Sequence, residues 1–368
     1  MSACPRCGVL NSLVSADMIT PKKKIVTSRK IATGIVIAIV VVVLAGIIFL
    51  LPTLADFVTQ HKDNPAITIL QPSTEQPRTV PREELVQHVL DRINEDRGDL
   101  GLLPVKLSSN QAAQIHAEDV FRTKQISHWT TNGEKPYMTY TQYDGKGSVQ
   151  QNVAIAGFTP EQHEQCVTNI LVKCEKIEPL STIDQLQYEM MYNDKECCND
   201  GHRNNILDPH HTHVSIGIVY DQYYLALVQN FENDYGLDVD VDVEDSQIEI
   251  SGTLLDGQLD HIAIYYDEIP SRAAYERNKD LLSYSAGELV AVVVKPLPPG
   301  YYYKSLQGYN LIEADSWSVQ RDSVNVIFDL ADAVNKDGTY TLFARIKDGE
   351  NMFDVTSYSV FVNSEENN

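Results

Sequence analysis

Histidine-containing segments hold the residues of this sequence that are best suited to chemistry. The most informative one reads Asn199-Asp-Gly-His-Arg-Asn-Asn-Ile-Leu-Asp-Pro209 and contains His202. A second is Ser127-His128-Trp129, and a third is a cluster of His210, His211 and His213. A neutral imidazole ligates divalent metal ions, and an imidazole beside a carboxylate can act as a general base. These are the two kinds of chemistry that the rest of the sequence has to support.

Several short motifs, taken in order, resemble the CAP superfamily, whose SCP domain occurs in cysteine-rich secretory proteins, antigen 5 and plant pathogenesis-related proteins. The short Gly-His-Arg form is similar to its microbial members. The resemblance covers about residues 81–232 and implies an α-β-α sandwich with a cleft. The motifs are Ile93-Asn94 through Gly101-Leu-Leu-Pro104, His116-Ala117, Ser127-His128-Trp129, Gln151-Asn152-Val153-Ala154, Asn199 to Pro209, and Val228-Gln-Asn-Phe231.

The resemblance also implies which side chains line that cleft. Family members place two histidines and two acidic residues there, and the matching histidines are His128 and His202. The first acidic position falls on Gln151, so glutamine replaces the family's glutamate. The second lies on the helix before Gly-His and matches Asp194, with Glu189 as the alternative.

Two imidazoles and one carboxylate in such a cleft form a three-ligand site for zinc or a similar divalent ion, with one position open for water. Without a metal, a histidine beside the carboxylate is a candidate general base. Gln151 weakens both readings, because an amide is a poor ligand and cannot take up a proton. The structural alternative is that His128 and His202 only brace the cleft through hydrogen bonds.

Two other groups of polar residues suggest metal binding less strongly. His210, His211 and His213 lie where the family has a variable loop, so we expect solvated histidines rather than a chelating cluster. The segment Asp238-Val-Asp-Val-Asp-Val-Glu244 alternates carboxylates along an extended chain. Calcium needs six or more oxygens that converge on one point, whereas alternation sets these acids in a row. We therefore expect a solvated strand face there.

An apolar segment divides the chain. Residues 31–51 contain no charged side chain, and 21 residues at about 1.5 Å each give roughly 32 Å, enough to cross a bilayer core. Five basic residues, Lys22, Lys23, Lys24, Arg29 and Lys30, directly precede this segment. The positive-inside rule therefore predicts a single-pass transmembrane helix in the cell membrane, with a cytoplasmic tail at 1–30. Residues 52–80 contain four prolines and read as an extracytoplasmic stalk.

The charge distribution follows the same division. The 368 residues carry 29 basic and 51 acidic side chains, a formal charge of −22. Residues 1–30 hold six basic side chains and one acidic, which leaves −27 for the rest of the chain. Such an acidic exterior repels phosphate backbones, so nucleic acid is excluded as a general partner.

The six cysteines divide along the same line. Cys4 and Cys7 lie in the tail and resemble half of a zinc ribbon, although a disordered tail with two reduced thiols is the simpler reading. The four others, Cys166, Cys174, Cys197 and Cys198, lie in the exported part, where disulfides form. Because a bond between adjacent cysteines is strained, we expect Cys166 and Cys174 each to pair with one of Cys197 and Cys198.

The periodicity of the exported part predicts two folded regions. Helical spacing over Leu85–Ile93, around Ala112–Phe121 and over 183–193, followed by strands at Val214–Tyr220 and Tyr223–Gln229, indicates an α+β domain at 81–235. After Tyr235 about seven short strands with turn signals predict an all-β, immunoglobulin-like sandwich at 236–368.

These features predict a membrane-anchored surface protein that binds a ligand. The expected partner is another surface protein, a cell-envelope component or an apolar ligand such as a lipid. The apolar ligand is what the resemblance to the CAP superfamily implies, because some of its members bind sterols or lipids. The alternative is a metal-dependent, peptidase-like hydrolase. Gln151 and the lack of a convincing nucleophile favour binding.

Overall fold

The computed structural model describes residues 79–169, 174–242, 246–303, 308–349 and 351–363. The predicted tail 1–30 with Cys4 and Cys7, the span 31–51 and all but the last two residues of the stalk 52–80 lie outside the described residues. Within the described ranges, no helix combines the length and the apolar character that a membrane crossing requires. The described residues from Val80 onward belong to one compact unit.

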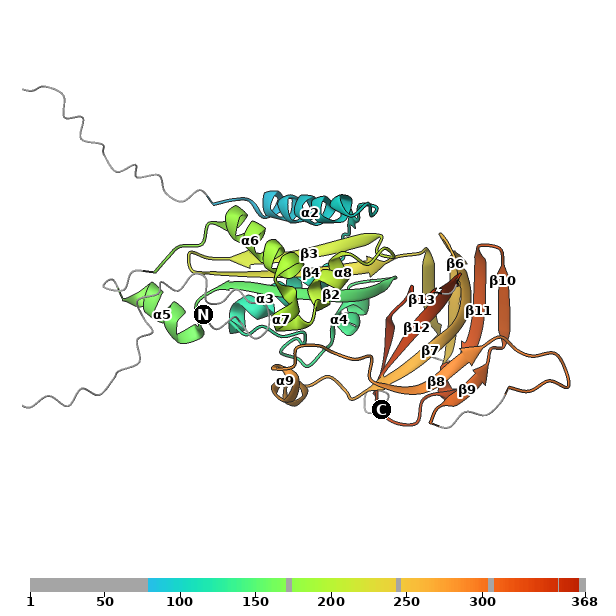
Figure 1. Cartoon of the computed structure of the whole chain (residues 1–368). Helices are drawn as coiled ribbons and strands as arrows, with labels where there is room; N and C mark the ends of the chain where they lie inside the picture. Colours follow the sequence, from blue (N-terminus) through green and yellow to red (C-terminus); the bar gives the residue numbers. More distant parts are fainter. Residues whose placement is uncertain (1–78, 170–173, 243–245, 304–307, 350, 364–368) are drawn as a thin grey trace, which may run out of the picture. The chain divides into compact units, whose positions relative to one another are not determined.

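The first part of this unit is an α+β arrangement around one four-stranded sheet (Figure 1). The sheet has the order β1-β3-β4-β2; β1 runs parallel to β3 and the other pairs are antiparallel. Its strands are β1 (Lys106–Leu107), β2 (Ser148–Gly157), β3 (His213–Tyr220) and β4 (Tyr224–Asn233). The helices are α2 (Arg82–Asp99), α3 (Ala112–Thr123), α4 (Pro136–Gln142), α5 (Pro160–Thr168), α6 (Pro179–Tyr192), α7 (Asp194–Cys198) and α8 (Gly201–Ile206).

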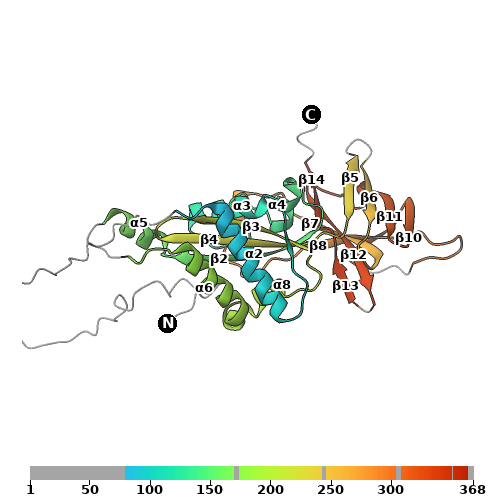
Figure 2. The same ribbon diagram turned by 90° about the horizontal axis from the view of Figure 1, so that it is seen from above.

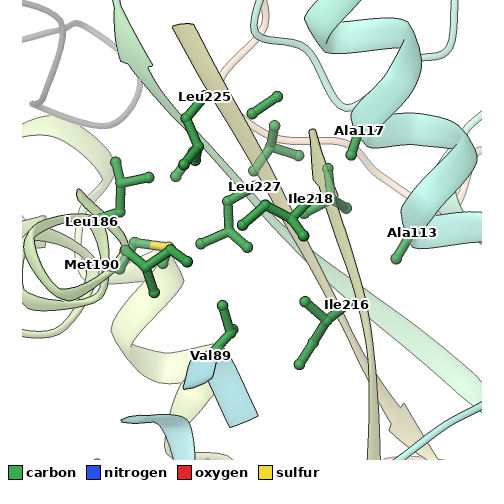
Figure 3. Close-up of a cluster of buried hydrophobic side chains, with 14 of the residues drawn as sticks. Val89, Ala113, Ala117, Leu186, Met190, Ile216, Ile218, Leu225 and Leu227 are labelled. Atoms are coloured by element: carbon green, nitrogen blue, oxygen red, sulfur yellow. The ribbon is translucent and has the colours of Figure 1, made fainter. Parts of the chain in front are cut away.

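Helices cover this sheet on both faces. Figure 2 shows α2 crossing over the sheet, and Figure 3 shows Leu186 and Met190 of α6 on one side of the strands with Ala113 and Ala117 of α3 on the other. Alternation along β3 explains this layering, because Ile216 and Ile218 are buried while Gly217 faces α3. A Cβ atom on Gly217 would collide with the carbonyl oxygen of Ala113, so glycine is what lets α3 lie directly on the strand.

The second part, hereafter the C-terminal region, consists of two sheets and one helix. One sheet has the order β10-β11-β6-β5, and the other has the order β13-β12-β7-β8-β9, with β14 paired to β12. The strands are β5 (Leu237–Asp242), β6 (Gln247–Thr253), β7 (Gln258–Asp267), β8 (Glu288–Val294), β9 (Asn310–Glu313), β10 (Ser316–Gln320), β11 (Ser323–Asp329), β12 (Gly338–Asp348), β13 (Asn351–Asp354) and β14 (Tyr358–Val362). The helix is α9 (Arg272–Asn278), and a 3₁₀ turn, η2, spans Leu330–Asp332.

The strand-rich character of the C-terminal region was predicted, and its two sheets share one apolar core. That core includes Ile250 of β6, Phe328 of β11, Ile264 of β7 and Leu342 of β12, all fully buried. The acidic row on β5 is solvated as expected, because Asp238, Asp240 and Asp242 are exposed. Two features were not expected: the helix α9, and the parallel pairing of β8 with β9.

A buried ion pair joins the two parts of the unit. Nζ of Lys135, which precedes α4, lies 2.6 Å from Oδ1 of Asp267, at the end of β7, and both side chains are about nine-tenths buried. The Tyr137 hydroxyl donates to the other carboxylate oxygen of Asp267 at 2.5 Å. Lys135 also donates to the carbonyl oxygen of Ser285, at 2.8 Å. The interactions of Lys135 therefore also hold the chain segment between α9 and β8 in place.

Apolar contacts and backbone hydrogen bonds extend this junction. Tyr137, Met138 and Val149 share a buried cluster with Ala263 and Phe343 of the C-terminal region. A second set of contacts joins the chain around β13 and β14 to the start of β2: Ser148 Oγ donates to the carbonyl oxygen of Asp354 at 2.7 Å, and the Ser357 amide donates to that of Gly147 at 3.2 Å.

The expected disulfide pairing is wrong. Cys166 pairs with Cys174, with their Cα atoms 5.7 Å apart, and Cys197 pairs with Cys198. Cys166 lies in the last turn of α5, and the chain that follows returns to it within eight residues. Cys197 and Cys198 end α7, which packs against α6 and α8, so each pair is formed by local chain neighbours.

We expect Asp267→Asn to lower the free energy of unfolding by about 3 kcal/mol, because the substitution leaves the Lys135 ammonium buried without a counter-charge. Urea unfolding of a chain comprising residues 79–368 measures this. The matched control is Glu268→Gln at the neighbouring position, where the side chain is 74 % exposed. Equal stability of the two variants would show that the buried pair does not hold the junction.

Candidate functional site

A cavity of about 400 Å³ lies where the four-stranded sheet meets the C-terminal region. The four-stranded part contributes residues of β2 and α8, and the C-terminal region contributes the segment 282–286, Phe343 of β12 and Asp354 of β13. The residues that line the cavity include His128, Tyr137, Gln151, Asn152, Cys198, His202, Leu282, Tyr284 and Phe343. The cavity therefore brings together side chains that are more than two hundred positions apart.

His202 enters the cavity as half of a buried pair. It follows the first residue of α8, and its Nδ1 lies 2.6 Å from Oδ1 of Asp194, the first residue of α7. Oδ2 of Asp194 accepts the backbone amides of His202 and Arg203, at 2.8 and 3.2 Å. Asp194 thus fixes the imidazole by one hydrogen bond and the backbone at the start of α8 by two more. Because Nδ1 is engaged with Asp194, Nε2 is the ring nitrogen left for a ligand.

His128 is held in a different way, with no carboxylate. Its Nδ1 lies 3.1 Å from Oε1 of Gln151, and Nε2 of Gln151 donates to Oδ1 of Asn230 at 3.1 Å. The ring also hydrogen-bonds to the backbone of Leu282. Burial lowers the pKa of His128 to about 4, against a smaller upward effect of the Gln151 contact. His128 is therefore a neutral imidazole at physiological pH.

Tyr284, which belongs to the C-terminal region, covers the ring of His128. The two rings lie 5.1 Å apart at their centroids, and Tyr284 is also 6.2 Å from the ring of Tyr137. The Tyr284 hydroxyl hydrogen-bonds to the backbone of Gln151, and burial raises the pKa of Tyr284, so the phenol stays neutral. The C-terminal region thus supplies an aromatic wall to a site whose histidines come from the first part of the unit.

The polar floor of the cavity is braced by amides. Nδ2 of Asn152 donates to the carbonyl oxygen of His202 and to Oε1 of Gln229, both at 3.3 Å. Nδ2 of Asn205 donates to Oδ1 of Asn152 at 3.0 Å. These bonds tie α8, which carries His202, to β2, which carries the Gln151 side chain that contacts His128.

One group of side chains in the described part of the chain brings four potential metal-ligand atoms together, two of which are the sulfur atoms of the Cys197–Cys198 disulfide. It comprises Asp194, Cys197, Cys198 and His202, and one donor atom from each lies within 4.8 Å of the others. The group contains two of the ligands expected from the sequence, Asp194 and His202, but it does not contain His128. Gln151 contacts His128 and lies outside this group as well.

The other acidic and histidine residues singled out in the sequence lie apart from the cavity. Glu189 is on α6, and its Oε2 accepts a hydrogen bond from Asn193 rather than lining the cavity. The expectation of solvated histidines at 210–213 is wrong for His211, which is 4 % exposed, stacks on Phe231 and contacts Asn233. His210 stacks on Phe353, so a strand of the C-terminal region covers this loop.

Several residues of the cavity had no signal in the sequence. Tyr137 and Phe343 occur in ordinary apolar patterns, and Leu282 and Tyr284 lie in a connection between a helix that was not predicted and β8. Only the contact between the two parts of the unit places them beside His128. The sequence predicted that Cys198 forms a disulfide, but it did not predict that Cys198 lines the cavity.

We expect the stability of the protein to fall as the pH drops from about 6.5 to 4, partly because of His128. The unfolded chain binds a proton on this imidazole below about pH 6.5, whereas the folded chain does so only near pH 4. The lowered pKa therefore removes about 2 kcal/mol of stability between pH 7 and 4.5. Urea unfolding at pH 7 and at pH 4.5 measures this decrease in the free energy of unfolding. The decrease should be about 2 kcal/mol smaller in His128→Gln than in the original protein. An unchanged pH dependence would contradict burial of a neutral His128.

Comparison with known proteins identifies the family to which part of the chain is similar. The family model described as CAP, the cysteine-rich secretory protein family, matches residues 90–231. A solved structure of an extracellular protein containing an SCP domain from Bacillus anthracis str. Ames is similar at 17 % identity, covers 42 % of this chain and 45 % of its own, and has a TM-score of 0.29. The search of curated proteins gave no match. Residues 90–231 of this chain are therefore a CAP domain, and His128, Asp194 and His202 lie within it.

Proposed function

We propose that this is a single-pass cell-membrane protein that displays the CAP domain outside the cell and binds a ligand in the cavity. The apolar segment 31–51 and the basic residues before it support the anchor and its orientation. The proposed order is the cytoplasmic tail 1–30, the span 31–51, the stalk 52–80, the CAP domain 81–235 and an immunoglobulin-like β-sandwich 236–368. The two sheets with a shared core support the last assignment.

The observation that carries the binding proposal is the composition of the cavity wall. Its volume of about 400 Å³ falls in the range of small-molecule sites. Tyr137, Tyr284 and Phe343 give it an aromatic side, and Gln151, Asn152 and His202 give it a polar side. This combination suits a small amphipathic ligand, such as a single-chain lipid or a short segment of an envelope component or surface protein.

The hydrogen bonds around the cavity favour binding over catalysis. His128 is neutral, faces an amide instead of a carboxylate and is covered by Tyr284, so it has no acidic partner to orient it as a base. Ser127, the neighbouring hydroxyl, accepts the amide of Trp129. Cys198 is bonded to Cys197. Each of the nucleophiles beside the histidines is thus engaged in a structural role.

A hydrolase is the second proposal, and the Asp194–His202 pair is the observation that favours it. A buried carboxylate that fixes Nδ1 of an imidazole leaves Nε2 suited to bind a divalent metal or to accept a proton. The metal would be zinc or a similar ion bound by Nε2 of His202, with Asp194 as the carboxylate that orients the ring and His128 as the other histidine of the family cleft. The peptidase-like alternative requires that these residues act together on a bound peptide.

We expect Tyr284→Ala to weaken ligand binding at least about tenfold, because the substitution removes the aromatic wall over His128. The measurement is thermal stabilisation of residues 79–368 by a panel of single-chain lipids, envelope glycan fragments and short peptides, followed by calorimetry on the compounds that stabilise.

Two further variants separate ring contact from other effects. Tyr284→Phe keeps the ring and loses only the hydroxyl bond, so it should bind within a few-fold of the original protein. Tyr301→Ala, at a residue that is 70 % exposed in the same region, is the surface control. Equal affinity of the original protein and Tyr284→Ala for every compound that binds would reject the cavity as the binding site.

The purified protein should not cleave peptides. Incubation of residues 79–368 with a mixed peptide library, with and without a metal chelator, followed by mass spectrometry, tests this expectation. Chelator-sensitive cleavage that disappears in His202→Ala would replace the binding proposal with the hydrolase. Cleavage that persists in His202→Ala would instead indicate a contaminating peptidase.

A further inference from the structure

The adjacent cysteines at the end of α7 lie beside both the cavity and the Asp194–His202 pair. Cys198 lines the cavity, and neither cysteine is fully buried. Sγ of Cys197 lies 3.9 Å from Oδ1 of Asp194, the same oxygen that contacts His202. The two sulfur atoms, one imidazole nitrogen and one carboxylate oxygen thus gather in one place, within 4.8 Å of one another.

This donor set is typical of sites for a thiophilic divalent cation. Two thiolates, an imidazole and a carboxylate are ligands that zinc takes in fourfold, tetrahedral coordination. The thiolates select against calcium and magnesium, which prefer oxygen ligands. A sulfur atom in a disulfide is not a thiolate, however, so the Cys197–Cys198 bond withholds half of the donors.

We propose that the Cys197–Cys198 disulfide is a redox gate on a metal site formed by Asp194, Cys197, Cys198 and His202. In the oxidised protein the site is closed to thiophilic metals. In the reduced protein the two thiolates join the imidazole and the carboxylate, and the four residues bind a cation of the zinc class. This inference does not depend on which ligand occupies the cavity.

The position of the pair in the chain suits reversible chemistry. A disulfide stabilises a protein mainly by closing a loop in the unfolded chain, and more so for a longer loop. Cys197 and Cys198 are consecutive, so their bond closes almost no loop, whereas Cys166 and Cys174 are separated by eight positions. The Cys197–Cys198 bond therefore adds little to the stability of the fold. Accessible disulfides of this kind are also the ones that exchange readily with external thiols.

The gate opens by thiol–disulfide exchange with an external dithiol. The first thiolate of the reductant attacks one sulfur atom, a mixed disulfide forms, and the second thiol of the reductant displaces the other protein sulfur. The products are two protein thiols and the oxidised, cyclic form of the reductant. A divalent cation then replaces the two thiol protons, which pass to solvent.

Metal binding would also change the ligand cavity, because His202 and Cys198 belong to both sites. In the oxidised protein His202 is fixed by Asp194 and lines the cavity. Once His202 and Asp194 ligate a cation, bonds to the metal replace the hydrogen bond between them, and that part of the wall carries a metal centre. Reduction of the Cys197–Cys198 disulfide would therefore change which groups line the cavity, and the chemistry of the cavity would depend on the redox state outside the protein.

Cobalt(II) titration of the full chain in detergent tests the gate, since tetrahedral cobalt with thiolate ligands absorbs in the visible and gives a sulfur-to-metal charge-transfer band. Cys4→Ser and Cys7→Ser are included to remove the other cysteine pair that suggests metal binding. A trialkyl phosphine reduces the disulfides, itself becoming the phosphine oxide with oxygen from water, and is removed before titration. Both absorption bands should appear in the reduced protein and be absent from the oxidised protein.

Three variants in this background assign the bands to their ligands. Cys197→Ser with Cys198→Ser should abolish the charge-transfer band, and His202→Gln should weaken cobalt affinity at least about tenfold. Cys166→Ser with Cys174→Ser is the matched control and should retain both bands. The proposal fails if oxidised and reduced protein bind cobalt equally, if the reduced protein gives no charge-transfer band, or if the band survives loss of Cys197 and Cys198.

Discussion

The buried carboxylate of Asp267 is the interaction on which the site depends most. It binds the Lys135 ammonium and the Tyr137 hydroxyl, and both of these groups also reach the carbonyl oxygen of Ser285. A charge this deeply buried is costly unless it is paired, so the pair favours one arrangement of the two parts of the unit. Since Ser285 follows Tyr284, the same bonds hold the aromatic wall over His128. A cavity with a CAP histidine on one side and a C-terminal tyrosine on the other is the direct result.

Much of the α+β fold was readable from local patterns, because each element carries its own signal. Helical spacing in α2, α3 and α6 and the apolar run of the β3–β4 hairpin have clear periods, and these elements are confirmed. Strand β2 was not predicted, because Gln150, Gln151 and Asn152 interrupt its apolar pattern while their side chains serve the cavity floor. Helix α9 is short and polar in composition, so its pattern has no apolar face long enough to recognise. A local pattern thus predicts a helix or strand well where packing in the core selects its residues. It predicts the element poorly where the site requires polar residues instead.

The site was predicted in part, since its two histidines sit in recognisable motifs while its walls do not. The sequence motifs predict His128 and His202 as site residues, and both line one cavity. The choice between Asp194 and Glu189 could not be made from spacing, because it depends on a turn between α7 and α8 that brings a carboxylate onto Nδ1 of His202. The disulfides were mispredicted for a related reason: avoiding a bond between adjacent cysteines assumed that all four lie close together in the fold. In the structure each pair forms between close neighbours in sequence.

The contact of Gln151 with His128 and the presence of two cysteines near His202 are best understood together. Burial keeps His128 neutral by lowering its pKa, and hydrogen bonds to the Gln151 amide and to the backbone of Leu282 engage its ring. On the other side of the cavity His202 has a buried carboxylate partner, and the donor atoms of Cys197 and Cys198 lie within 4.8 Å of those of His202 and Asp194. The metal site that we propose therefore lies at the α7–α8 turn and not between the two histidines. His128 instead forms, with Tyr284, an aromatic wall of the cavity. In the arrangement that we propose, a ligand packs against this wall and the metal binds on the opposite side of the cavity.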